Sequence, residues 1–95
     1  MDKNKIITKK EIIFFLKKLI FKNKITKNFS KINIFKLKQI NSLTIFKIIL
    51  AIESKYKIKL KDEEIFSNQF NSINKISILV SKKIKKLLKN ENKKS

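Results

Sequence analysis

Apolar residues recur at helical spacing in three separate stretches of this chain, and this pattern constrains the fold more than any other feature of the sequence. The first stretch follows Thr8-Lys9-Lys10-Glu11, a capping box in which the Thr hydroxyl and the Glu carboxylate each accept a bond from the other's backbone amide. The stripe that follows consists of Ile12, Leu16, Leu19 and Ile20. We therefore expect a helix over residues 8–22.

The second expected helix, over residues 42–56, begins at the Asn41-Ser42 pair, which supplies an N-cap. It is apolar around most of its circumference, so we expect it to lie centrally and to pack against several neighbours. A final helix is expected over residues 72–88. Its apolar stripe consists of Ile73, Ile76, Val80, Ile84 and Leu87.

A short third helix is expected between these two. It opens on Asp62, Glu63 and Glu64, whose charges suit the positive end of a helix dipole better than they suit a metal, because adjacent helical residues diverge. Its expected anchors are Ile65, Phe66 and Phe70. Residues 23–40 lack a sustained period, and we interpret them as a long loop with a short helical turn rather than a strand.

The chain has 95 residues, which allows one small domain. We expect a single all-α domain over residues 1–95, a four-helix bundle of three long helices and one short one. Its core should span about residues 8–88, with a frayed basic tail over 89–95. We also expect a monomer.

Cys and His are both absent, which removes the thiolate and imidazole ligands of zinc and the His-based catalytic triads. We therefore expect neither a metal site nor an enzyme. No apolar run reaches the length of a transmembrane helix, because Lys17 and Lys18 interrupt residues 11–21. The sequence thus favours a soluble, cytoplasmic protein.

The formal net charge is +18, and all 25 basic residues are Lys. Gly and Pro are absent and Ala occurs once, as expected from mutational drift toward AT-rich codons in a protein of any function. Arg is the preferred side chain for bidentate phosphate and base contacts, so the charge is weak evidence for nucleic-acid binding. The alternative hypothesis is a basic helical protein that binds nucleic acid or an anionic surface. The lysine run over residues 82–89 would be the binding region of such a protein.

The motif Ile40-Asn41-Ser42-Leu43 starts the second expected helix, which ends in Glu53-Ser54-Lys55-Tyr56. Further residues follow at fixed offsets, namely Ile58, Leu60, Asp62-Glu63-Glu64, Phe70, Ser72-Ile73, Ile76 and Val80. Over residues 40–82 this order resembles the acyl and peptidyl carrier proteins, whose modified serine lies in a motif that often reads Asp-Ser-Leu.

The resemblance implies a bundle of acyl-carrier type with 4'-phosphopantetheine attached covalently to Ser42, between Asn41 and Leu43. A phosphopantetheinyl transferase would attach the arm, and acyl-loading and condensing enzymes of fatty-acid or polyketide-type biosynthesis would use it. The protein would hold acyl or aminoacyl groups as thioesters and would catalyse nothing itself. A carrier fold that has lost the modification and serves as a structural subunit is a further possibility.

The resemblance also implies a partner-facing surface, for which we select Phe46, Lys47 and Ile65, with loop residues near Phe35 close to the arm. The chain departs from the family in having Asn before the serine, and Lys47 and Lys55 where carriers usually present acidic residues. Five aromatic residues could stack nucleic-acid bases, but aromatic residues at helical spacing usually belong to the core. They are Phe14, Phe15, Phe46, Phe66 and Phe70.

Overall fold

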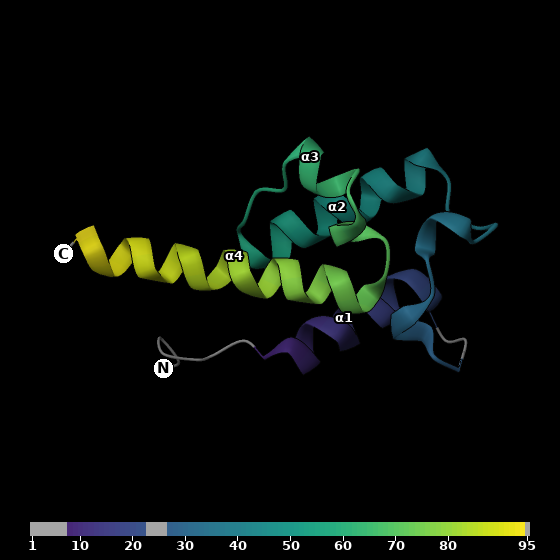
Figure 1. Cartoon of the computed structure of the whole chain (residues 1–95), viewed down its shortest axis with the longest axis horizontal. Coiled ribbons are helices and arrows are strands. Elements are labelled where there is room, and N and C mark those ends of the chain that lie inside the picture. Colours follow the sequence, from purple (N-terminus) through teal and green to yellow (C-terminus); the bar gives the residue numbers. More distant parts are fainter. Residues whose placement is uncertain (1–7, 23–26, 95) are drawn as a thin grey trace.

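The computed structural model describes residues 8–22 and 27–94, with side chains up to residue 89. Four α-helices are present in this part of the chain (Figure 1): α1 (Lys9–Phe21), α2 (Ser42–Tyr56), α3 (Asp62–Ile65) and α4 (Ile73–Lys94). Three short 3-10 turns connect them: η1 (Phe29–Lys31), η2 (Ile34–Lys36) and η3 (Asn68–Phe70). The predicted all-α bundle of three long helices and one short helix is confirmed. Residues 1–7, 23–26 and 95 of the predicted domain lie outside the described residues.

Helix α1 begins at the predicted capping box. The Thr8 hydroxyl accepts a hydrogen bond from the Glu11 amide at 3.2 Å, and the Glu11 carboxylate accepts one from the Thr8 amide at 3.0 Å. These two bonds satisfy amides that a helix start otherwise leaves without partners. The predicted start of the first helix is therefore confirmed.

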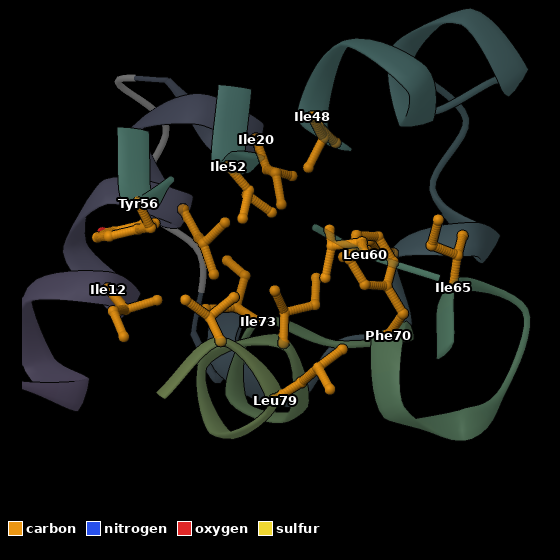
Figure 2. Packing of buried hydrophobic residues seen from close by; sticks show 14 of the residues in the cluster. Ile12, Ile20, Ile48, Ile52, Tyr56, Leu60, Ile65, Phe70, Ile73 and Leu79 are labelled. Atoms are coloured by element: carbon orange, nitrogen blue, oxygen red, sulfur yellow. The ribbon is translucent and has the colours of Figure 1, made fainter. Parts of the chain in front are cut away.

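The core lies where α1, α2 and α4 face one another. Figure 2 shows Ile12 of α1, Ile52 of α2, and Ile73 and Leu79 of α4 directed toward a common space. The fully buried side chains also include Leu16, Ile34, Ile48, Phe70, Ile76 and Val80. Burying an Ile or Leu side chain is worth about 1.5–3 kcal/mol relative to leaving it exposed, so this cluster fixes how the helices pack.

The segment between α1 and α2 is a loop with two helical turns, as predicted, over its described residues 27–41. Two contacts hold it to the rest of the molecule. The ring of Phe29 packs edge-on against Phe21 at 6.3 Å between centroids, and the Ile34 amide donates to the Asn71 carbonyl at 2.8 Å. Because Ile34 is fully buried, the loop is anchored to the core close to the start of α2.

Helix α4 continues to Lys94, so the predicted frayed tail is wrong for residues 89–94. The sequence there contains no Gly or Pro to end the helix. At 22 residues, α4 is about 33 Å long, and its C-terminal part, yellow in Figure 1, extends beyond the other helices. Leu87, predicted to belong to the buried stripe, is consequently 39 % exposed.

Helix α2 ends at a residue with left-handed backbone geometry. Lys57 has φ 56° and ψ 45°, a conformation that Gly usually adopts at the C-terminal ends of helices. The chain contains no Gly, so a lysine adopts it. The turn directs residues 58–60 back across the bundle, where Ile58 and Leu60 are buried.

The prediction that α2 lies centrally among several neighbours is wrong for one side of the helix. Only Ile48, Ile52 and Tyr56 of this helix are buried, on a single face. The opposite face exposes Leu43, Phe46 and Leu50. None of the described helices combines the length and the apolar character needed to cross a membrane.

Candidate functional site at the start of helix α2

Ser42 is the first residue of α2 and is exposed. The residue that caps the helix is its neighbour Asn41, whose side-chain oxygen accepts from the Thr44 amide at 2.9 Å and from the Thr44 hydroxyl at 3.0 Å. The Asn41 backbone carbonyl also accepts the first helical bond, from the Ile45 amide at 2.9 Å. Ser42 therefore sits within the first turn of the helix and is not needed to start it.

Because Asn41 caps the helix, the Ser42 hydroxyl is not used for capping. Most serines at helix starts serve as caps, with the hydroxyl bound to a backbone amide. Here Asn41 performs that task, and within the described part of the chain the Ser42 hydroxyl forms no hydrogen bond. The hydroxyl is free to react at the positive end of the α2 dipole, where phosphate groups are favoured.

Ser42 lies beside a groove of about 700 Å³ between η2, α2 and α3, which we call the serine groove. Four exposed apolar side chains line it, and the buried Ile65 closes it toward the core. The four exposed residues are Phe35, Phe46, Leu50 and Phe66. Large apolar side chains gathered around a hollow in this way are typical of interaction surfaces.

The predicted partner-facing residues differ in their exposure to solvent. Phe46 and Lys47 are exposed, as expected for that role, and Leu43 beside Ser42 is 61 % exposed. Ile65, by contrast, is only 6 % exposed and belongs to the core cluster. Ile65 also lines the serine groove, so a partner could contact it only from within that groove.

The aromatic residues expected in the core divide in the same way. Phe70 is fully buried and Phe15 is partly buried, as expected. Phe66 was expected to anchor α3, but it is 81 % exposed at the edge of the serine groove, and Phe14 is also exposed. Helical spacing alone therefore did not identify which aromatic side chains the core covers.

Glu64 attaches α3 to the long helix α4. Its carboxylate accepts from the Lys61 amide at 2.8 Å and pairs with the Lys83 ammonium at 2.9 Å. Partial burial alone would raise the pKa of Glu64, but the Lys61 amide and the Lys83 ammonium together hold that pKa below its ordinary value. The ionised carboxylate thus fixes α3, and with it Phe66, at the groove.

Glu53 fixes the opposite wall of the groove. Its carboxylate accepts from the Leu60 amide at 2.8 Å, which links α2 to the connection that leads into α3. Asp62 also lines the groove and is exposed. No group of three or more acidic side chains in the described part of the chain is arranged to hold a metal ion.

Comparisons of the chain with protein-family models, with curated proteins and with solved structures found no match. The residues themselves therefore carry the functional argument. The structure brings the predicted Asn41, Ser42 and Phe46 together at one groove and adds Leu50 and Phe66, which sequence reasoning did not select. The signal for Leu50 was the width of the apolar face of α2, which exceeds what one neighbouring helix can cover, whereas no feature of the sequence indicated Phe66.

Proposed function

We propose that this protein is an acyl or aminoacyl carrier that holds its cargo as a thioester on a phosphopantetheine arm attached to Ser42. The observation that carries the proposal is the exposed Ser42 hydroxyl, which is spared from helix capping by Asn41 and lies beside an apolar groove. The resemblance of residues 40–82 to carrier proteins supports the same assignment.

The attachment reaction requires only an accessible hydroxyl on the carrier. The Ser42 oxygen forms a new phosphoester bond to the phosphopantetheine phosphorus of coenzyme A, and the bond to the departing adenosine bisphosphate breaks. The hydroxyl proton passes to a base of the transferase. The attached phosphate then lies at the N-terminus of α2, where the helix dipole stabilises its charge by about 0.3–1 kcal/mol.

The arm supplies a thiol, which the polypeptide lacks because it contains no Cys. The walls of the serine groove offer an apolar surface for the arm or for partner enzymes. Because α2 presents Lys47 beside Phe46, we propose that transferase, loading and condensing partners approach with acidic surfaces. The protein binds and presents a substrate, and the enzymes that meet it perform the chemistry.

Incubation with coenzyme A and a broad-specificity phosphopantetheinyl transferase tests the proposal by intact mass. We expect the addition of one phosphopantetheine to the full chain and none to Ser42→Ala. The matched control is Ser54→Ala, because Ser54 is an exposed serine of the same helix and its loss should leave the addition unchanged.

Failure of the full chain to gain mass, or a gain that persists in Ser42→Ala, would contradict the carrier function. Intact mass of the protein from its own cells gives a second reading. An unmodified protein there would favour a carrier fold that acts as a structural subunit.

A second candidate function is favoured by α4, which carries four exposed lysines within residues 82–89, Lys82, Lys85, Lys86 and Lys89. Such a helix can bind nucleic acid or another polyanion through its charge. This candidate predicts an affinity that falls steeply with salt. Binding that is lost at physiological salt would leave the charge without a functional role of this kind.

A further inference from the structure

A second groove lies at the opposite end of α2, between the last turn of that helix and the first half of α1. It has a volume of about 550 Å³, and we call it the tyrosine groove after Tyr56. Two rings of α1, Phe14 and Phe15, form its apolar part together with Tyr56. The rings of Phe15 and Tyr56 meet edge-on at 5.7 Å between centroids, which holds the tyrosine in one position.

The hydroxyl group of Tyr56 is the feature that makes this groove informative. Tyr56 is 7 % exposed, and its hydroxyl oxygen is buried without a hydrogen-bond partner in the described structure. Figure 2 shows the hydroxyl on the side of the ring that points away from the neighbouring isoleucines. A buried polar group left unpaired costs about 1–3 kcal/mol, so such groups are uncommon and call for an explanation.

The surroundings keep this hydroxyl a hydrogen-bond donor. Burial, and secondarily the nearby Glu11 carboxylate, raise the pKa of Tyr56 above its ordinary value. Glu11 itself directs its carboxylate to the Thr8 amide at 3.0 Å, as part of the capping box. The donor therefore needs an acceptor that the described residues do not provide.

Positive charge surrounds the same groove. The Lys18 ammonium lies 4.9 Å from the centre of the Phe14 ring, and the Lys55 ammonium lies 5.1 Å from Phe15 and 5.9 Å from Tyr56. Lys10 also lines the groove, and Glu11 is the one carboxylate among its lining residues. Ring faces hold ammonium groups at such distances, and the excess of cations attracts an anion.

We propose that the tyrosine groove binds a small molecule with a flat aromatic body and one carboxylate or phosphate group. The body packs against Phe14 and Phe15, an oxygen of the anionic group accepts from the Tyr56 hydroxyl, and Lys18 and Lys55 balance the charge. The groove has the size of a small-molecule site, about 300–1,000 Å³. Because the oxygen is shielded from water, the ligand reaches it when a side chain at the edge of the groove changes rotamer, a motion of picoseconds to nanoseconds.

The composition of the chain provides a direct probe of this site. Tyr56 is the only tyrosine, so protein labelled with 13C-tyrosine gives a single set of ring signals. We would titrate the full chain, as Ser42→Ala, with benzoate and with phenyl phosphate, and compare benzyl alcohol and inorganic phosphate at equal concentrations. The Ser42→Ala background separates this result from the outcome of the carrier test.

We expect saturable shifts of the Tyr56 ring with the two aromatic anions, and at least tenfold weaker effects with the neutral alcohol or with phosphate alone. Tyr56→Phe lacks the labelled tyrosine, so its affinity is measured from backbone amide spectra. This affinity should be about tenfold lower, as expected for the loss of a hydrogen bond to a charged group. Lys55→Gln should weaken it at least threefold. Lys75→Gln, an exposed lysine of α4 outside the groove, is the matched control and should change nothing.

The proposal is overturned if neither aromatic anion produces a saturable shift. It is equally overturned if benzyl alcohol binds as well as benzoate, if the shifts centre on the serine groove, or if Tyr56→Phe and Lys55→Gln both bind like the unaltered chain. Should Tyr56→Phe fail to fold, Lys55→Gln and the ligand series decide the matter by themselves.

Discussion

The two ends of helix α2 each carry a hydroxyl group beside a groove, and the two hydroxyls differ in accessibility. Ser42 is exposed at the start of the helix, where a large enzyme can reach it. Tyr56 lies in the last turn with its oxygen shielded from water, where only a small molecule can approach it. In our two proposals, one helix carries the site of covalent modification at one end and the site for a small ligand at the other.

The electrostatic surroundings of the two grooves differ as well. Glu53 and Asp62 line the serine groove, whereas Lys10, Lys18 and Lys55 outnumber Glu11 in the tyrosine groove. The net charge of +18 is therefore unevenly expressed at these two sites. We therefore expect an anionic ligand to favour the tyrosine groove over the serine groove.

Among the variants that test the difference between the two ends of α2, Ile52→Ala should have the largest effect on stability. Ile52 is fully buried on the face of α2 that packs against the core, and this face holds the helix that borders both grooves. Its truncation should cost about 2–5 kcal/mol of unfolding free energy, measured by urea denaturation, and should impair both sites. Leu50→Ala is the control, since Leu50 is an exposed residue of the same helix. An equal loss in the two variants would show that this face does not hold α2 in place.

A smaller effect confined to one end is expected for Asn41→Ala. Loss of the cap should lower the unfolding free energy by about 1 kcal/mol and slow modification of Ser42, with no change in the Tyr56 ring signals. Asn33→Ala is the control, because Asn33 accepts from the Phe35 amide at 3.0 Å and caps only the short turn η2. Slowed modification in Asn33→Ala to the same extent would mean that the cap of α2 is not what positions Ser42.

The smallest expected effect, at the other end, depends on pH. The folded-state pKa of Tyr56 is raised, so its contribution to stability is fully present below the unfolded pKa of about 10 and is lost as pH rises through the folded pKa. The unfolding free energy of the chain should therefore fall relative to that of Tyr56→Phe in this range. Deprotonation of the lysines affects both proteins alike and cancels in the difference. A constant difference from neutral to alkaline pH would argue against a buried, protonated hydroxyl.

The start of α2 and its cap were predictable because both depend on adjacent residues. Asn41 needs only the Thr44 amide three positions later, and the Thr8 capping box is equally local. The exposure of Phe66 was not predictable, because it depends on whether another element covers α3, which the spacing of residues along one helix does not specify. Burial of the Tyr56 hydroxyl likewise depends on α1, more than thirty residues earlier in the chain.

The end of α4 illustrates a different reason for a wrong prediction. Residues 89–94 carry charge and no apolar stripe, which suggested fraying, yet the helix continues through Lys94. Lys, Glu and Asn lack the backbone restrictions that end helices, and a helix already formed extends at little cost per residue. A charged sequence therefore did not by itself mark the end of the element.

The left-handed turn at Lys57 bears on the stability of the chain. A side chain in that conformation costs about 1–2 kcal/mol relative to glycine, and the chain contains no Gly. Lys57→Gly should accordingly raise the unfolding free energy, measured by urea denaturation, by up to about 1 kcal/mol once the greater freedom of glycine in the unfolded chain is subtracted. An unchanged or lower unfolding free energy would show that the lysine is accommodated without strain. Lys57 is therefore a position at which one substitution should stabilise the chain without altering the path of its backbone.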